Sequence, residues 1–176
     1  SSCTDFSDVF QDCTSLKEID MTGWDTSKGT TFAQMLFNCK SLGHVDLSPL
    51  DTSSAVSFRQ MLYGCSSLAE VDLSGFKTSK ATTFASMLNG CSSLTRVDVT
   101  GFDLSSAKDL SMFFFNCKSL EEADLATTGM SKVTTLYGAF GGCSSLKSVD
   151  VSSLDVASVA NFAYCFSGCA KLEKLD

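Results

Sequence analysis

The chain has 176 residues, of which 44% are hydrophobic, and it carries a formal net charge of −7. This length suggests one domain. The negative charge argues against nucleic acid as a partner and against electrostatic docking on anionic lipid, because both need clustered Lys and Arg. No apolar run approaches the roughly 20 residues of a membrane-spanning helix. We therefore expect no membrane insertion within this segment.

One cysteine recurs with a constant 26-residue period, without insertion or deletion. The series is Cys13, Cys39, Cys65, Cys91, Cys117, Cys143 and Cys169. A fixed period of this size predicts a solenoid in which each repeat stacks only on its neighbours. The chain divides into a half repeat at 1–12, full repeats at 13–38, 39–64, 65–90, 91–116, 117–142 and 143–168, and a stub at 169–176. Because both ends fall inside a repeat, we expect a single repeat domain that is a fragment of a longer chain.

These seven equivalent cysteines should stack in a column, about 4.8 Å apart, with parallel Cβ vectors. A disulfide instead needs Cβ atoms about 3.8 Å apart that turn toward each other. We therefore expect buried thiols that pack as small hydrophobes. A zinc site is disfavoured because there is no CxxC motif and His44 is the single histidine, so no metal or cofactor is expected. Cys3 and Cys165 lie outside the column, and Cys165 falls four residues before Cys169 on a predicted helix, where packing is its expected role.

Each repeat begins with a predicted strand, as the unit from Cys65 shows. Val71 and Leu73 alternate with Asp72, which predicts a strand with one buried face. Strands that recur at this period must pair in parallel. A turn region follows, in which Phe76 is expected to be a buried anchor and Ser79 to form local hydrogen bonds to the backbone.

The repeat closes with a predicted helix. Phe84, Met87, Leu88 and Cys91 fall at i, i+3, i+4 and i+7, the apolar stripe of a short amphipathic helix, and the threonines at 82–83 suit its start. The residue before each later cysteine of the column is always Gly or Asn, types that tolerate the left-handed conformation ending a helix. These residues are Asn38, Gly64, Gly90, Asn116, Gly142 and Gly168. The expected fold is an α/β solenoid with one 26-residue repeat per turn, one parallel β-sheet face and one short-helix face.

The LxxVDL pattern after each cysteine looks like a leucine-rich repeat. The longer pattern CSSLxxVDLSGFDTSKxTTFxxMFxG resembles the 26-residue repeat of bacterial surface proteins and lipoproteins of the BspA-like leucine-rich repeat family. The resemblance implies a right-handed coil in a cell-surface or secreted protein that works in adhesion or protein–protein interaction. Because both ends of the chain look cut, we expect an anchoring segment to lie outside it. The unit at 126–132 departs from the pattern, because it lacks the aromatic anchor and the usual Asp. The family offers no active site to transfer, and no nucleophile–base pair is present, so we expect no enzyme.

An aspartate occupies the outward strand position of every repeat. This Asp column is Asp20, Asp46, Asp72, Asp98, Asp124, Asp150 and Asp176. Neighbouring carboxylates about 4.8 Å apart repel by roughly 1 kcal/mol in water, so something must offset the repulsion. In a structural interpretation each Asp accepts hydrogen bonds, for example from the hydroxyl two residues on, which belongs to Thr22, Ser48, Ser74, Thr100 or Ser152. In a functional interpretation the column is an acidic strip for a basic partner; calcium would need more oxygen ligands than it supplies.

Two further sets of residues are candidates for binding. The mixed column, which lies beside the Asp column, contains Glu18, His44, Glu70, Arg96, Glu122, Ser148 and Lys174. Repeat proteins place specificity at such variable positions, although a plain solvated face is equally compatible. Phe37, Tyr63 and Phe115 lie off the apolar stripe and are candidates for aromatic docking on the helical side, or they fold over the edges of neighbouring repeats.

The sequence thus favours a non-catalytic module that binds a protein or glycan partner. The alternative is an architectural spacer or linker subunit that supplies length and rigidity and makes contacts at its ends with neighbouring repeats or subunits. A binding module should concentrate varied residues on one face, whereas a spacer should be uniform on both.

Overall fold

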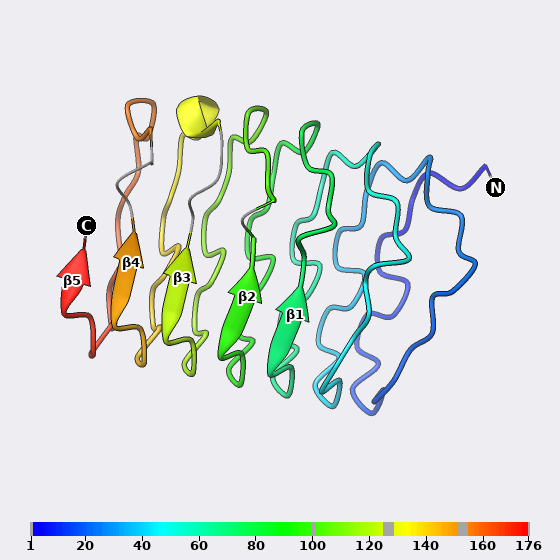
Figure 1. Cartoon of the computed structure of the whole chain (residues 1–176), viewed down its shortest axis with the longest axis horizontal. Coiled ribbons are helices and arrows are strands. Elements are labelled where there is room, and N and C mark those ends of the chain that lie inside the picture. The colour runs from blue at the N-terminus through cyan, green and yellow to red at the C-terminus, as the bar shows by residue number, and fades with distance from the viewer. Residues whose placement is uncertain (1, 100, 125–128, 151–154, 176) are drawn as a thin grey trace.

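The fold was obtained as a computed structural model, which describes residues 2–99, 101–124, 129–150 and 155–175. The chain winds as a coil whose successive repeats lie side by side from the N-terminal to the C-terminal end (Figure 1). Its regular elements are β1 Glu70–Asp72, β2 Arg96–Asp98, β3 Glu122–Asp124, the 3-10 helix η1 Met130–Lys132, β4 Ser148–Asp150 and β5 Lys174–Leu175. This repeating coil confirms the predicted solenoid.

The strands line one side of the coil, called here the sheet side. They pair in parallel in the orders β1-β2 and β3-β4-β5. Glu70 lies opposite Arg96 and Asp72 opposite Asp98, so one turn of the coil takes one repeat, as predicted. Val71 is buried between the exposed side chains of Glu70 and Asp72, which is the alternation expected of a strand with one buried face.

The prediction of a short-helix face is wrong. The described residues contain no α-helix, and turns occupy the segment 85–90. Met87 N–H donates to Phe84 O at 3.0 Å and Cys91 N–H to Leu88 O at 3.2 Å, three residues back as in β-turns. Ser86 and Gly90 adopt left-handed φ values of 56° and 77°, which a continuous α-helix does not allow.

Hydrogen bonds between repeats explain why turns replace the helix. Leu62 N–H donates to Met87 O of the next repeat at 2.9 Å, and Gly64 N–H donates to Asn89 O at 2.7 Å. Alternate backbone donors therefore leave the segment instead of closing helical rings. A second ladder of parallel bridges, which starts at Asp5↔Thr31 and ends at Thr135↔Asn161, runs about half a repeat away from the strands. The predicted apolar stripe is nevertheless real, because Phe84, Met87, Leu88 and Cys91 are buried.

The left-handed conformation predicted before each cysteine is confirmed. Asn38, Gly64, Gly90, Asn116, Gly142 and Gly168 all have φ between 57° and 77°. A second left-handed residue lies four positions earlier in each repeat, at Gln34, Gln60, Ser86, Met112, Gly138 and Tyr164. The sequence did not reveal this second position, because most of its residues are not of the types that favour positive φ.

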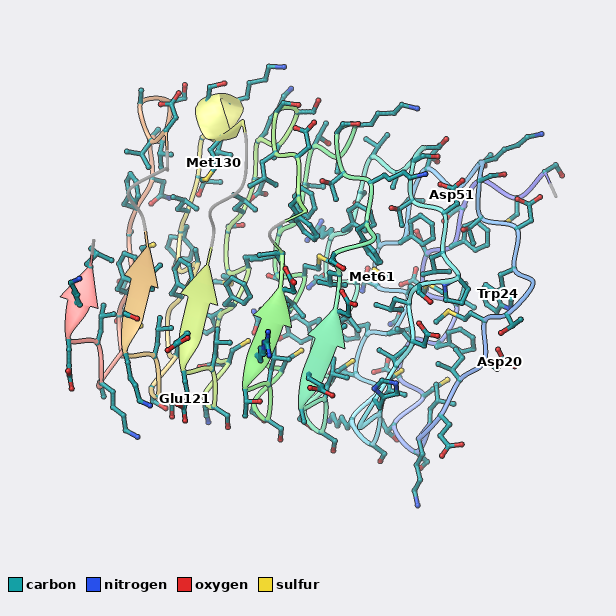
Figure 2. The ribbon with its side chains drawn as sticks, viewed as in Figure 1. Asp20, Trp24, Asp51, Met61, Glu121 and Met130 are labelled. Carbon is teal, nitrogen blue, oxygen red and sulfur yellow. The ribbon has the colours of Figure 1, made fainter. Side chains whose placement is uncertain are left out.

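Buried side chains of the same type stack through the centre of the coil. Phe32, Phe58 and Phe84 are fully buried, with centroids of neighbouring rings 5.9 and 5.5 Å apart. Met130, the first residue of η1, is also buried (Figure 2). Each repeat thus contributes one layer to a continuous core, and its stability depends on the layers on either side.

The cysteine column is buried as predicted in its central members. Cys39, Cys65, Cys91, Cys117 and Cys143 have no exposed surface, whereas Cys13 is exposed and Cys169 half-buried. All nine cysteines of the chain are free thiols. Each central thiol donates to the backbone carbonyl 29 residues earlier, as Cys91 Sγ does to Leu62 O at 3.2 Å. Cys165 is buried in a turn, and Cys3 is exposed.

A buried threonine joins the loops of consecutive repeats. Thr26, Thr52 and Thr78 are each 1% exposed. The Thr52 hydroxyl accepts the N–H of Lys77 at 2.8 Å and donates to the carbonyl of Lys77 at 3.3 Å. Thr26 and Thr78 form the same pair of bonds with Asp51 and Asp103. One hydroxyl thus satisfies two backbone groups of the next repeat.

Thr52→Val is expected to lower the free energy of unfolding by about 1–3 kcal/mol, because it removes both hydrogen bonds between the buried Thr52 hydroxyl and the backbone of Lys77. Urea denaturation measures the change. Thr52→Ser is the matched control, since it keeps the hydroxyl, and it should lose less than Thr52→Val. A valine variant as stable as the wild type would show that this hydroxyl does not join the repeats.

Candidate binding surface on the sheet side

A hollow of about 600 Å³ lies on the sheet side and spans three consecutive repeats. The Asp column contributes Asp46, Asp72 and Asp98 to its lining, and the mixed column contributes His44, Glu70 and Arg96. The strands β1 and β2 bring four of these residues together, because their register places Glu70 beside Arg96 and Asp72 beside Asp98. The sequence had placed all six on one outward face, and the structure gathers them around one depression.

Buried apolar residues form the inner wall of this hollow. Leu47, Leu50, Val71 and Phe76 line it and are each no more than 5% exposed. Phe76 is the predicted buried anchor of its repeat, and Leu50 holds the equivalent position 26 residues earlier. Neither residue was predicted from the sequence to line a surface hollow. One feature of the sequence could have indicated this role: both residues lie in the turn that follows the strand position of their repeat. That turn carries the chain around the edge of the sheet side.

The other predicted sheet-side residues lie outside the hollow. Glu18, Asp20 and Glu122 are exposed, and Asp20 lies with Trp24 toward the N-terminal end of the coil (Figure 2). The side chains of Asp124 and Asp150, and all of Asp176, lie outside the part of the chain that the structure describes. Beside the mixed column, Lys147 Nζ contacts Glu121 Oε2 at 2.6 Å and links two further repeats.

The aspartates of the column are held by a local hydrogen bond. The Oδ1 atoms of Asp20, Asp46 and Asp72 accept the backbone N–H of the residue two positions on, at 2.8, 2.9 and 2.9 Å. The hydroxyl of that Thr or Ser and its N–H together lower the pKa of each carboxyl. The structural interpretation gave the hydroxyl as an example of a donor, and the backbone N–H is a donor that it did not name.

Acidification is expected to destabilise the protein as the pH falls below the ordinary Asp pKa of 3.8. The folded pKa of these carboxyls lies below the unfolded one. They therefore contribute stability above the unfolded pKa, and this contribution is lost as the pH falls through the folded pKa. Urea denaturation at a series of pH values measures the dependence.

The matched variant carries Asp20→Asn, Asp46→Asn and Asp72→Asn. Asparagine keeps an oxygen acceptor for the backbone N–H but does not titrate. Its free energy of unfolding should fall less steeply with acid than that of the wild type. Equal slopes would show that these carboxylates do not contribute to acid sensitivity.

The three aromatic candidates pack against neighbouring repeats. Phe37 and Tyr63 stack with ring centroids 4.6 Å apart, and the ring of Phe115 lies over Gly141, where a Cβ would be 2.8 Å from it. All three are half-buried. These contacts are those of the packing interpretation, and a docking role for the three rings stays a prediction.

Neither a metal cluster nor a membrane span is found among the described residues. In that part of the chain, no group of three or more His, Cys, Asp or Glu side chains could hold a metal ion. No helix there is long and apolar enough to cross a membrane.

The repeat, the parallel strands and the buried column define a leucine-rich repeat solenoid of the BspA-like kind. The chain belongs to the family described as "Mycoplasma protein of unknown function, DUF285", whose model matches residues 4–125 and 108–176. No curated protein matches the chain.

Two solved structures of leucine-rich repeat proteins are similar to the chain. A leucine-rich repeat protein of T. pallidum is 25% identical, with a TM-score of 0.53 over 81% of this chain and 60% of that chain. The present chain therefore spans less than two thirds of that relative. A leucine-rich repeat protein from Bacteroides ovatus ATCC 8483 is 18% identical, with a TM-score of 0.44 over 78% of this chain and 38% of that one.

Proposed function

We propose that the chain is a non-catalytic binding module of a cell-surface or secreted protein, which uses its sheet side to bind a protein or glycan in adhesion. The observation that carries this proposal is the hollow, where the variable residues His44, Glu70 and Arg96 meet the uniform Asp column. An extended surface of stacked repeats is a common binding surface in solenoid proteins. The likeness of the repeat to those of bacterial surface proteins supports the location.

The chemistry of the hollow supports binding rather than catalysis. Asp46 and Asp72 have the same local hydrogen bonds, and the pKa of each is lowered for the same reason. Acid–base catalysis by two carboxyls needs environments that move their pKa values apart. The repeated local environment gives these two residues no such difference.

The test is a pull-down of the segment against extracellular matrix and host surface proteins. The sheet-side variant carries Glu18→Ser, Glu70→Ser, Arg96→Ser and Glu122→Ser. A control variant carries Arg59→Ser and Lys108→Ser, at exposed positions near the second ladder. The proposal predicts that the wild type and the control capture the same partner and that the sheet-side variant does not.

Two other results would contradict the proposal. Equal capture by all three folded proteins would indicate that the partner binds away from the sheet side, at the turns that carry Phe37, Tyr63 and Phe115. Capture by none of them, with each still folded, would favour the spacer, which makes its contacts at the ends of the coil.

A further inference from the structure

We infer that the sheet-side hollow takes a positively charged helical segment of a partner protein, whose Lys or Arg side chains recur every three to four residues. This inference rests on the proposed function and names the chemistry of the partner. It follows from the charge of the hollow, the fixed orientation of its carboxylates and the spacing between them.

The lining of the hollow is predominantly acidic. Asp46, Glu70, Asp72 and Asp98 contribute four carboxylates, against the single guanidinium of Arg96. With His44 neutral, these side chains carry three net negative charges. Complementary charge steers a partner and fixes its register on a surface, so the hollow favours a cationic segment over a neutral or acidic one.

The Asp side chains of the hollow are oriented before any partner arrives. Oδ1 of Asp46 accepts the N–H of Ser48 at 2.9 Å, and Oδ1 of Asp72 accepts the N–H of Ser74 at 2.9 Å. Each carboxylate is thereby held in one orientation while its side chain remains exposed. A surface whose groups are already ordered loses less conformational entropy on binding.

The spacing of the Asp column distinguishes a helical partner segment from an extended one. Asp46, Asp72 and Asp98 occupy equivalent positions in neighbouring repeats and are therefore about 4.8 Å apart, or roughly 10 Å over three repeats. A helix that lies across the strands brings every third or fourth residue to one face at intervals of about 5 Å. In an extended strand, alternate residues are about 6.7 Å apart and span roughly 13 Å over three side chains. The helix matches the column better.

Fluorescence anisotropy with labelled synthetic peptides tests the inference. The probe is an alanine-based peptide of about 15 residues whose Lys residues are spaced alternately three and four positions apart, which is long enough to form a helix. Two reference peptides carry Glu at the same positions, or keep the Lys residues but replace central alanines with proline, which prevents a helix. We expect the helical-spacing Lys peptide to bind most tightly, and its affinity should fall as salt screens the charges.

Two protein variants with the same change in net charge locate the binding. The hollow variant carries Asp46→Asn, Asp72→Asn and Asp98→Asn. The control carries Asp5→Asn, Asp103→Asn and Asp109→Asn, whose Oδ1 atoms also accept an N–H two residues on but lie outside the hollow. We expect the hollow variant to lose about tenfold in affinity for the Lys peptide, the sum of three modest ion pairs. The control should stay within about twofold of the wild type.

The remaining outcomes overturn the inference. An equal loss in both variants would show a response to net charge alone, and tighter binding of either reference peptide would exclude a basic helix as the occupant. If the Lys peptide does not bind but the sheet-side variant of the pull-down still loses its partner, this inference fails and the proposed function stands. If both experiments show no binding, both fail.

Discussion

Raising the pH from about 8 to about 11 is expected to unfold the protein, because five thiols are buried in the cysteine column. Burial raises the pKa of Cys39 to about 11 and of Cys143 to about 12, and it raises those of Cys91 and Cys117 well above the ordinary value of 9.0. Cys65 is shifted in the same direction for the same reason. The folded protein therefore keeps protons that the unfolded chain releases.

The sign and size of this effect follow from proton linkage. Because the folded pKa exceeds the unfolded one, the stabilisation is complete below pH 9.0 and is lost as the pH rises toward the folded value. Each thiol contributes a slope of about 1.4 kcal/mol per pH unit in that range. Five thiols together give a slope of about 7 kcal/mol per pH unit, which is comparable to the whole stability of a typical domain.

Urea denaturation under reducing conditions, at a series of pH values above 8, measures the slope. The variant with Cys65→Ala and Cys117→Ala removes two of the buried titrating thiols. Its absolute stability should be lower, but its slope against pH should be shallower by about 2.7 kcal/mol per pH unit. An unchanged slope would show that the thiols do not control alkaline unfolding.

Phe58→Ala is expected to lower the free energy of unfolding by about 3–5 kcal/mol, since it removes a large, fully buried side chain from the middle of the aromatic stack. The ring of Phe58 has neighbours on three sides, with centroids at 5.9 Å for Phe32, 5.3 Å for Phe76 and 5.5 Å for Phe84. Loss of this layer weakens the contact between the repeats on either side. Urea denaturation measures the change, and amide hydrogen exchange shows which repeats open.

Later repeats of the chain have leucine at the position of Phe58, which suggests a control substitution. Leu110 and Leu136 occupy the same position in later repeats and are buried there. Phe58→Leu should therefore cost clearly less than Phe58→Ala. Equal losses of stability for the two variants would mean that the stack containing Phe58 does not stabilise the coil through the volume of its side chains.

Features that repeat in every unit could be predicted from the sequence. The constant spacing of the cysteines predicted the register of the strands, seen in the pairing of Glu70 with Arg96. The alternation around Asp72 predicted its outward position. The restriction to Gly or Asn before the cysteines predicted a left-handed backbone, because few other residues tolerate it. Each of these signals depends on local geometry alone.

Features that depend on contacts between repeats could not be predicted in the same way. The stripe of Phe84, Met87 and Leu88 fits a helix and a series of turns equally, and only the bond from Leu62 N–H to Met87 O in the next repeat decides between them. Thr52 resembles an ordinary polar loop residue until stacking of the repeats places the backbone of Lys77 against it. The hollow likewise exists only where three repeats meet.

The central claim is that the sheet-side hollow is the binding surface. Amide hydrogen exchange of the protein with and without the partner captured in the pull-down tests this claim most directly. Binding there predicts slower exchange at the segments that line the hollow, 44–48, 70–76 and 96–98, with the segments around Phe37, Tyr63 and Phe115 unchanged. Slower exchange around those aromatic residues, or confined to the two ends of the coil, with the hollow unaffected, would contradict it.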